Sequence, residues 1–599
     1  TLPYMVDTIP RAVDTVHTTD SFFLLKSKGI LGRLAKSIVT DTTAPTNITR
    51  LDVLYRKYTG RIIRNIEVRV VDFGVPINDT SKSFKNTLTK LADALHKTTR
   101  DHVILKNIFF KKNDTLLPIL LADNERHLRN QPYLQDARIV VKSVLGTRDS
   151  VDIIVFTKDV LSLGGTLKMS SPTKYEVAAK EDNFAGWGDH IQAGIYYDKD
   201  RKKPFGHMAE YTARNVGGSF ADLNVGFRDY GDAFNNFLKQ ETTVYTRFIR
   251  PLVNPYVKWT YAFEAATHRT QNMFETDSLY YWDNRYKYYN VDAWAGINLS
   301  AKSFSGSKDY DDRLRTLIGL RVVHQDFQEL PKKYESEYFY QYASLTGVLA
   351  EISIFRQDFY KTQYVYGFGR NEDVPEGLDF SVTTGWTDKV QRIRPYMGLD
   401  MSFNYFSKKG NYYNYTLRLG TYNYQRKYED ISALANLEFF SRLKQISKRW
   451  KQRTFINGGL STIWNRTLSE PLLLESQYGL PEYTNIFLGG DHRLTVKAES
   501  VFFSPYNFVG FKFAGFVFGN GCLLTPETMP ISDTKLYGTV GAGIRTRNES
   551  LIFGTLELKT YYFPGKNFNG DRFRVEFNTA VKFKYNNQTV KRPEFIVLN

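Results

Sequence analysis

The stretch RFRVEFNTAVKFKY, residues Arg572–Tyr585, places apolar and polar side chains in alternation. One face carries Phe573, Val575, Phe577, Thr579, Val581, Phe583 and Tyr585. The other face carries Arg572, Arg574, Glu576, Asn578, Ala580, Lys582 and Lys584. A period of two indicates a β-strand whose two faces meet different surroundings. A soluble sandwich gives this pattern when one face packs on a second sheet, and a transmembrane barrel gives it with lipid outside and a wet lumen inside.

Repetition of the pattern decides between these two folds. Segments with strand character dominate from Leu163 onward, and segments rich in Gly, Asn, Asp and Lys separate them. We find about 20 such candidates, a spacing typical of outer-membrane barrels. Only closure removes every edge from so large a sheet. We therefore predict a mainly β protein whose residues 162–599 form a transmembrane antiparallel barrel, with a long loop around 465–488 and a short C-terminal tail.

Composition excludes several other classes of protein. The chain has 599 residues and no run of eighteen apolar residues, which excludes helical membrane spans. Aromatic residues reach 15%, which suits the interfacial girdles of a barrel. Cys522 is the single cysteine, so neither a disulfide framework nor a cysteine zinc cluster is expected.

The net charge of +17 is spread along the chain. No basic face is clustered as nucleic-acid binding requires, so no nucleic-acid partner is expected. Several lysines fall on the predicted lumen side of strands near the C-terminus: Lys497, Lys512, Lys559 and Lys582. A cationic lumen could meet acidic polypeptide, anionic lipid headgroups or no ligand at all. The nine His residues are scattered without metal-site spacing, and no catalytic motif is present, so we expect neither metal, cofactor nor enzymatic activity.

Two regions precede the predicted barrel. Residues 1–58 are irregular apart from the amphipathic stretch Phe22–Val39, which could lie on the membrane, plug the lumen or pack on its neighbour. Residues 59–161 show the order strand, helices, strand, strand and are predicted to form a compact α+β module. Its strands are expected at 61–71, 137–144 and 152–156, and its helices at 84–96, after Thr99 and at 117–129.

The chain resembles the BamA/TamA superfamily of outer-membrane assembly and protein-export barrels, and looks like its Bacteroidota branch. Residues 59–161 resemble one POTRA module, the periplasmic docking domain of that family, and Ile104–Val141 is the most specific part of this resemblance. The segment EDNFAGWGD, Glu181–Asp189, is similar to the Asp-Asn-x-x-Gly-x-Gly turn between the second and third barrel strands. Leu488–Pro505 resembles the strand after the long sixth loop and leaves room for five strands to the end. The resemblance implies about sixteen strands, an outer-membrane location and an N-terminal domain in the periplasm.

The chain departs from the family pattern at two matching places. The family loop carries an Arg-Gly-Phe/Tyr tip, whereas this chain reads Gly479-Leu480-Pro481-Glu482-Tyr483. The family strand Phe-x-Asp-x-Gly reads Phe516-Val517-Phe518-Gly519-Asn520 here, so the acid that would pair with the loop arginine is missing as well. A buried arginine without its carboxylate is costly, so joint loss of both is coherent. We expect the loop to be held in another way, with Glu482 facing a lumen lysine or arginine.

The resemblance and the strand pattern together predict a protein insertase or exporter with a weak lateral seam. The first strand candidate is short and rich in glycine and polar residues, whereas the last is long and regular. The predicted seam residues are Gly165, Thr166, Leu167, Lys168 and Met169 on the first strand and Val575, Phe577, Thr579 and Val581 on the last. An open seam could template an incoming strand by β-augmentation, although a barrel can also simply begin with a poor strand.

The partners expected on this basis are outer-membrane lipids, client outer-membrane or surface proteins, and accessory periplasmic or lipoprotein subunits. A second docking site is predicted at the possible strand edge Arg138, Ile139, Val140 and Val141 of the module. Two other functions stay open: a passive channel with a basic lumen, and a structural barrel subunit of a larger outer-membrane complex.

Overall fold

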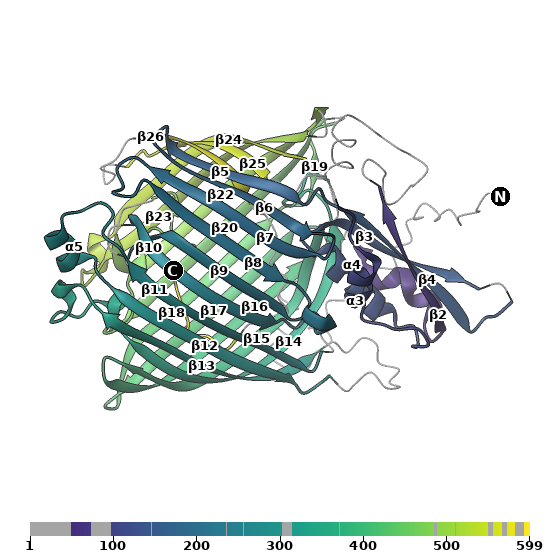
Figure 1. Cartoon of the computed structure of the whole chain (residues 1–599), viewed down its shortest axis with the longest axis horizontal. Coiled ribbons are helices and arrows are strands. Elements are labelled where there is room, and N and C mark those ends of the chain that lie inside the picture. The colour runs from purple at the N-terminus through teal and green to yellow at the C-terminus, as the bar shows by residue number, and fades with distance from the viewer. Residues whose placement is uncertain are drawn as a thin grey trace.

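The computed structural model describes residues 49–72, 97–144, 146–234, 237–254, 257–301, 314–369, 372–447, 449–483, 488–508, 511–548, 555–565, 572–581 and 592–599. Within these residues the chain forms a 23-stranded antiparallel sheet and a separate three-stranded sheet. Three members of the large sheet are two-residue strands, β1 (Thr49–Arg50), β19 (Lys444–Gln445) and β21 (Leu472–Leu473). The other 20 make the wall of a nearly closed barrel (Figure 1).

The first ten wall strands are β5 (Leu163–Ser171), β6 (Lys174–Phe184), β7 (Asp189–Asp198), β8 (Phe205–Ala213), β9 (Asp222–Asp232), β10 (Lys239–Arg250), β11 (Trp259–Thr270), β12 (Lys287–Asn298), β13 (Arg315–Glu329) and β14 (Leu345–Thr362). The others are β15 (Glu372–Lys389), β16 (Arg392–Phe406), β17 (Tyr412–Tyr424), β18 (Lys427–Phe440), β20 (Lys451–Trp464), β22 (Gly489–Phe508), β23 (Phe511–Pro526), β24 (Lys535–Asn548), β25 (Thr555–Tyr562) and β26 (Phe573–Val581). Short helical turns lie in loops: η3 (Val216–Gly218), α5 (Asp277–Asp283), η4 (Lys332–Tyr334), η5 (Tyr340–Tyr342) and η6 (Ile531–Asp533).

The wall has the apolar exterior that the alternating sequence predicts. In β26 the side chains of Phe573, Val575 and Phe577 are 74%, 68% and 55% exposed. Large apolar side chains are exposed in the same way around the wall, among them Trp259, Leu320, Ile352, Trp386, Ile393, Trp464, Val517 and Ile544. So much exposed apolar surface is stable only against lipid, which makes this a transmembrane barrel. No helix among the described residues is long and apolar enough to cross a membrane.

The strand count agrees with the upper of the two numbers expected from the sequence, 20 rather than sixteen. β14 and β15 pair over their full lengths, from Leu345 opposite Lys389 to Thr362 opposite Glu372. Five strands follow the long loop, β22 to β26, as the sequence predicts.

The first and last wall strands, β5 and β26, lie next to each other and bring the sheet nearly to closure (Figure 1). Every other neighbouring pair of wall strands has a defined register of opposed residues. β5 and β26 are hydrogen-bonded neighbours as well, but over the described residues they contact each other much less than any other neighbouring pair of wall strands. The seam is therefore the least extensive junction of the wall.

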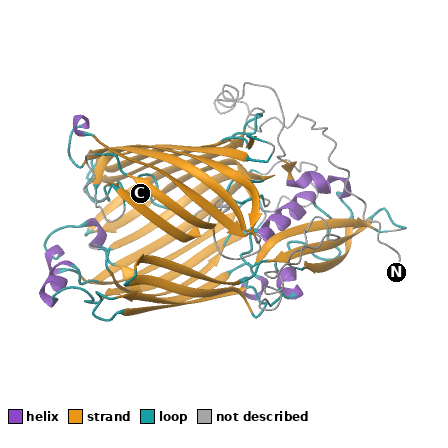
Figure 2. Ribbon diagram, turned by 90° about the horizontal axis from the view of Figure 1, so that it is seen from above, coloured by secondary structure: helices purple, strands orange, loops and turns teal. Residues whose placement is uncertain are grey.

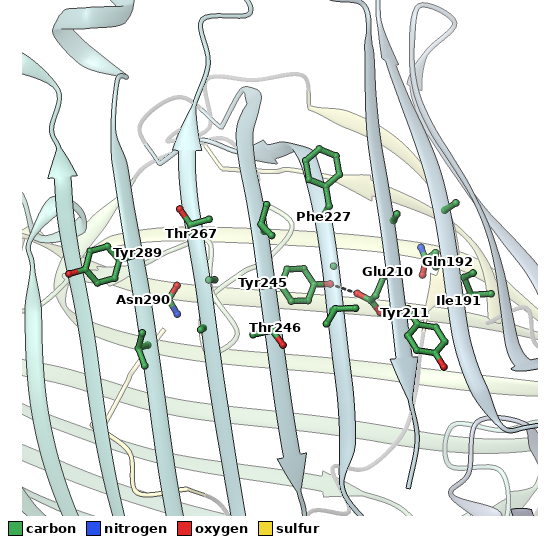
Figure 3. Close-up of a pocket in the computed structure, with 18 residues that line it drawn as sticks. Ile191, Gln192, Glu210, Tyr211, Phe227, Tyr245, Thr246, Thr267, Tyr289 and Asn290 are labelled. Carbon is green, nitrogen blue, oxygen red and sulfur yellow. Dashed lines mark hydrogen bonds between the residues drawn. The ribbon is translucent and has the colours of Figure 1, made fainter. Parts of the chain in front are cut away.

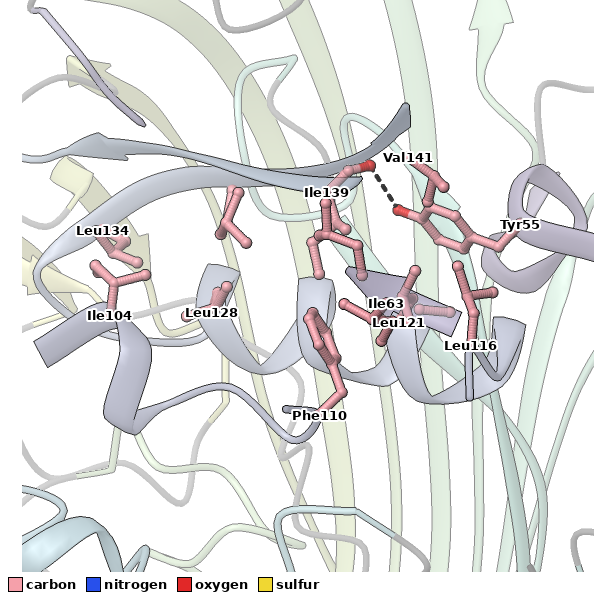
Figure 4. Packing of buried hydrophobic residues seen from close by; sticks show 14 of the residues in the cluster. Tyr55, Ile63, Ile104, Phe110, Leu116, Leu121, Leu128, Leu134, Ile139 and Val141 are labelled. Carbon is pink, nitrogen blue, oxygen red and sulfur yellow. Dashed lines mark hydrogen bonds between the residues drawn. The ribbon is translucent and has the colours of Figure 1, made fainter. Parts of the chain in front are cut away.

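The N-terminal module contains η2 (Leu51–Tyr58), β2 (Ile62–Val71), α3 (Asp101–Lys106), α4 (Pro118–Arg129), β3 (Leu134–Ser143) and β4 (Ser150–Asp159). Its sheet order is β2-β4-β3, with β4 parallel to β2 and antiparallel to β3. Apolar residues of both helices and all three strands form one core, including Ile63, Ile104, Leu121, Leu128 and Ile153 (Figure 4). Tyr55 of η2 packs into that core, so the module begins before residue 59. The stretch 22–39 and the helix expected at 84–96 lie outside the described residues.

The module lies against one end of the barrel in both views (Figures 1 and 2). β1, just before the module, pairs with the end of β14 through Thr49 opposite Lys361 and Arg50 opposite Tyr360. Through this pairing the chain contacts the wall before it enters the module.

Candidate functional site

The seam is the first element of the candidate site. Leu167 and Met169 of β5 are exposed at 44% and 64%, on the same outer face as Leu163. An added Cβ at Gly165 would lie 3.0 Å from the carbonyl oxygen of Ala178, so this glycine lets β5 approach β6 closely. Thr166 and Lys168 alternate with these positions, and Lys168 forms an ion pair with Glu176 of β6 at 3.6 Å. On β26, Val575 and Phe577 face outward, and Thr579 and Val581 continue the strand.

The turn between the second and third wall strands connects the barrel to the module. Gly186 and Gly188 have φ values of +77° and +78°, which favour glycine. A Cβ on Gly186 would lie 2.6 Å from the carbonyl oxygen of Thr98, and one on Gly188 would lie 2.9 Å from the Tyr133 ring. Asn183 donates to the carbonyl oxygen of Lys97 at 3.0 Å and accepts from the Gly188 N–H at 2.8 Å. The segment Glu181–Asp189 therefore seats the barrel rim on the module.

A buried ion cluster makes a second contact between module and barrel. Arg129 of α4 donates from Nε and Nη2 to the two carboxylate oxygens of Asp373 on β15, at 3.0 and 2.8 Å. It also donates to Glu125, which in turn receives Lys361 of β14 at 3.1 Å. Burial raises the pKa of the Glu125 carboxyl, but Arg129 and Lys361 outweigh burial and lower that pKa to about 2. Asp373 and Glu125 in the same way raise the pKa of the Arg129 guanidinium against the effect of burial.

The predicted docking edge is at the edge of the module sheet, because among the described residues β3 pairs with β4 alone. Its Ile139 is nevertheless covered. The Ile139 N–H donates to Glu125 at 3.0 Å, and its carbonyl oxygen accepts from the Tyr55 hydroxyl at 3.0 Å (Figure 4). Ile139 and Val141 are buried, and Arg138 and Val140 are half-buried. An incoming strand would have to displace η2 at this point. The edge that the sequence predicts as a docking site is therefore covered at Ile139.

The long loop folds into the lumen and is anchored at its base. Asp430 of β18 pairs with Arg394 of β16 at 2.6 Å and accepts from the Thr467 and Ser469 N–H groups at 2.7 and 3.2 Å. Further along, Leu474 and Leu480 are fully buried. The loop therefore has a core of its own against the inner wall.

The loop tip is held by hydrogen bonds to three strands. The Glu482 carboxylate accepts from Asn520 of β23 at 2.8 Å and from the hydroxyl of Thr539 on β24. Arg574 of β26 donates to the main-chain oxygen of Glu482, and the Tyr483 hydroxyl donates to the Gly538 oxygen at 2.9 Å. The hydrogen bonds to the Glu482 carboxylate come from neutral donors, while Arg574 meets the main-chain oxygen. The carboxylate also interacts electrostatically with Lys497, one of the lumen lysines that the sequence predicts. Leu480 packs in the core, with Gly479 and Pro481 beside it.

Three of the predicted lumen lysines contact groups inside the barrel. Lys497 of β22 donates to the Gln477 oxygen of the loop at 2.9 Å, and Lys512 of β23 donates to the Phe368 oxygen at 2.7 Å. Lys559 of β25 lies over the Phe518 and Tyr561 rings, 4.3 and 4.9 Å from their centroids. Lys497 and Lys512 therefore hold loop segments by hydrogen bonds, and Lys559 makes cation–π contacts with two aromatic rings. Lys582 lies outside the described residues.

The C-terminal residues Arg592–Asn599 also enter the lumen, which the sequence reasoning missed. Arg592 contacts Asp292 of β12 at 2.6 Å, and Asn599 accepts from the Leu473 N–H at 2.8 Å (the side-chain oxygen is the acceptor). In both views the C-terminus lies within the outline of the barrel (Figures 1 and 2). The only sequence signal is the apolar run Phe595–Leu598 after a polar stretch. Such a run indicates that the segment is buried, but it does not indicate which residues bury it.

A hollow of about 820 Å³ lies on the wall across β7 to β12 (Figure 3). Small residues such as Ala193, Ala209 and Ala265 line it. Tyr245 lies over Gly226, where a Cβ would collide with its ring, and its hydroxyl donates to Glu210. The hollow includes none of the predicted site residues. No group of His, Cys, Asp and Glu in the described ranges is arranged to hold a metal ion.

The fold and the site define a transmembrane β-barrel with an α+β module docked on one end and a lumen filled by a loop and a tail. No family model matches the chain, and no curated protein matches it. The fold is similar to BamA from Haemophilus ducreyi lacking POTRA domains 1–3, at 12% identity and a TM-score of 0.28, over 86% of this chain and 83% of that one. It is also similar to CdiB from Acinetobacter baumannii, at 10% identity and a TM-score of 0.40, over 91% and 95%. CdiB from Escherichia coli matches at 9% identity and a TM-score of 0.38, over 87% and 76%. At these values the function has to be argued from the residues of this chain.

Proposed function

We propose that this protein is a non-enzymatic component of the bacterial outer membrane that inserts or exports outer-membrane or surface proteins. Its module lies in the periplasm, and client strands enter between β5 and β26. The observation that carries this proposal is the seam, where β5 and β26 contact each other much less, over the described residues, than any other neighbouring pair of wall strands. The motifs that resemble the BamA/TamA superfamily, Glu181–Asp189 above all, support it.

The physical basis is the hydrogen-bonding capacity of an incompletely paired edge. A strand edge without a partner presents main-chain N–H and C=O groups that pair with any incoming strand, and in lipid these groups must be satisfied. β5 is nine residues long and contains Gly164 and Gly165, so it contributes few cross-strand side-chain contacts. A client strand that pairs with such an edge gains main-chain hydrogen bonds at little cost in lost barrel contacts.

The module has the role of presenting clients or accessory subunits at the end of the seam. Its turn contact, Glu181–Asp189, joins β6 to β7 and is therefore only one hairpin away from β5. Accessory periplasmic or lipoprotein subunits are proposed partners of the module, and lipids are proposed to cover the apolar wall. An open passive channel is disfavoured because the loop tip and the tail cross the lumen.

A disulfide lock across the seam tests the proposal. Cysteines are placed at Leu167 and Thr579 in a Cys522→Ser background, and neighbouring registers are scanned. We expect the locked protein to lose its support of outer-membrane or surface protein assembly, and reductant to restore it. The matched control joins β24 and β25 at Ile544 and Leu558, an outward-facing pair already in register. Full activity with a verified seam lock and an inert control would refute lateral opening.

A further inference from the structure

The C-terminal residues lie on an inner face of the barrel that is shaped for a peptide. Pro593 contacts β13, Phe595 contacts β14 and β16, and Ile596 contacts β16 and β17. Leu598 and Asn599 reach β22 and the base of the long loop. Successive residues thus meet successive strands, so the segment runs across the strands in an extended path.

Wall side chains recognise the main chain of this segment. Arg321 of β13 donates to the Pro593 oxygen at 2.8 Å, and the Tyr396 hydroxyl of β16 accepts from the Ile596 N–H at 2.7 Å. Arg493 of β22 donates to the Leu598 oxygen. Every peptide presents these three main-chain groups, so the contacts do not depend on the tail's own sequence.

Glycines form the floor of the groove. A Cβ added to Gly319 would lie 2.9 Å from Pro593, and one added to Gly347 would lie 2.9 Å from Phe595. At Gly420 the same distance to Ile596 is 2.9 Å. Three glycines on three strands thus leave room for three tail side chains, and larger residues would fill the space.

The two ends and the centre of the groove give it chemical preference. Arg592 forms an ion pair with Asp292 at 2.6 Å, and Arg321 holds the same carboxylate with two hydrogen bonds. At the centre the Phe595 ring packs edge to face on Tyr396, with centroids 5.1 Å apart. At the far end Asn599 donates to the Pro471 oxygen at 2.8 Å. The groove therefore fits a basic residue, then an aromatic and aliphatic centre, then an amide.

We propose that this groove is a binding site for extended peptide segments, that Arg592–Asn599 is its tethered occupant, and that a client segment takes the place of the tail. The client step rests on the proposed function, whereas the peptide site does not. Glu594 and Val597 are exposed, so one edge of the tail faces the open lumen and an incoming segment can begin exchange there.

Peptide binding to the reconstituted barrel tests the site. A fluorescent peptide with the sequence of residues 592–599 is titrated against the full chain and against a variant that ends at residue 591, with anisotropy as the readout. A covalently linked tail competes at an effective concentration on the order of millimolar. For an intrinsic peptide Kd of about 10 μM, the full chain should therefore bind the free peptide roughly 100-fold more weakly than the truncated variant. A scrambled peptide of the same composition should bind the truncated variant at least about tenfold more weakly than the native sequence.

Filling the groove separates specific binding from adsorption. In the truncated chain, Gly347→Leu should weaken peptide binding at least about tenfold. Gly458→Leu, at a β20 position with open space around its added Cβ, should leave binding unchanged. No binding to the truncated variant, equal binding of the scrambled peptide, or an inert Gly347→Leu overturns the site.

Competition tests the client step. A urea-unfolded small outer-membrane barrel protein is diluted into the assay, and we expect it to displace the labelled peptide. If the peptide binds but the unfolded protein fails to displace it, the client step is overturned and the site serves the tail alone. That result leaves lateral opening to be judged by the seam lock, so the two failures are distinguishable.

Discussion

A carboxylate on the loop, rather than one on the wall, holds the tip of the lumen loop in this barrel. Glu482 is 7% exposed and accepts hydrogen bonds from Asn520 and Thr539. Asn520 lies two residues beyond Phe518, on the same inward-facing side of β23. Because charge-assisted hydrogen bonds are stronger than neutral ones, a single buried acid with two donors can replace an arginine–carboxylate pair. Arg574 adds a main-chain contact from the seam strand β26.

Removal of the Glu482 carboxylate should loosen the loop. Glu482→Ala leaves the donors Asn520 and Thr539 without their acceptor, which should lower the free energy of unfolding by about 1.5–3 kcal/mol. Glu482→Gln keeps an acceptor oxygen and should cost less. The measurement is urea-induced unfolding in lipid, followed by tryptophan fluorescence. Equal unfolding midpoints for the wild type and Glu482→Ala would show that the loop is held by its apolar core alone.

Two titrating residues of the module give it a defined response to acid. The pKa of Glu125 is lowered to about 2 from 4.5, because Arg129 and Lys361 outweigh burial. Burial, with a contribution from Arg126, lowers the pKa of His127 to about 3 from 6.5. Both pKa values are depressed in the folded state, so the unfolded state binds more protons and stability falls as pH falls. His127 contributes between pH 6.5 and about 3, and Glu125 between pH 4.5 and about 2.

We therefore expect the module to lose stability in two steps on acidification. His127→Gln should abolish the loss between pH 6.5 and 4.5 and leave only the Glu125 contribution below pH 4.5. The measurement is hydrogen exchange of α4 amides, corrected for the intrinsic pH dependence of exchange. An unchanged profile in His127→Gln would mean that another group controls the first step.

At the scale of elements, one arginine of α4 links the module to β15. Both partners of the Arg129–Asp373 pair are about 5% exposed, so water does not weaken it as it does a surface pair. Removing one partner of a buried pair typically costs roughly 3–5 kcal/mol, because the other charge stays buried. Glu125 remains beside Arg129 and should reduce that cost.

Asp373→Ala should release the module from the barrel end in a fraction of molecules. The measurement is the distance distribution between a spin label on α3 and one on β16, which should broaden toward longer distances. Arg64→Met serves as the matched control, because its ion pair with Asp152 lies wholly within the module and is exposed on the arginine side. A distribution identical to the wild type in Asp373→Ala would place the docking energy in the turn Glu181–Asp189 instead.

The alternation of apolar and polar residues predicted the barrel, because successive residues of a strand face lipid and lumen in turn and the pattern is visible within each strand. The turn at Glu181–Asp189 was predictable only from its resemblance to a family motif, and the five strands from Gly489 onward from that resemblance together with the strand pattern. The tail was not, because Arg592–Asn599 depends on residues such as Asp292, Tyr396 and Arg493, which only the curvature of the wall brings together. The covered edge at Ile139 was missed because Tyr55 lies in a segment that looks irregular in sequence.

At the scale of the whole molecule, the seam, the loop and the tail form one connected system. The loop tip contacts β26 through Arg574, and the loop base contacts the tail through Asn599. Arg493 of β22 touches both, since it donates to Leu473 and to Leu598. Movement of the tail therefore changes the support of the loop, and movement of the loop changes the support of the seam strand.

This connection predicts how ion conductance responds to truncation. A chain that ends at residue 591 loses the segment that crosses the lumen, so its single-channel conductance in planar bilayers should exceed that of the full chain. The open lumen should prefer anions, because Lys497, Lys512 and Lys559 face it. Dissolved salt screens the attraction between these lysines and a passing anion only in part when the two charges are closer than the screening length. Val597→Ser, at a tail side chain that is 54% exposed, should stay closed and serves as the control. If Glu482→Ala is combined with the truncation, conductance should rise further, because the loop tip loses its anchors on β23 and β24. Equal conductance of the full and truncated chains would show that the loop alone closes the lumen.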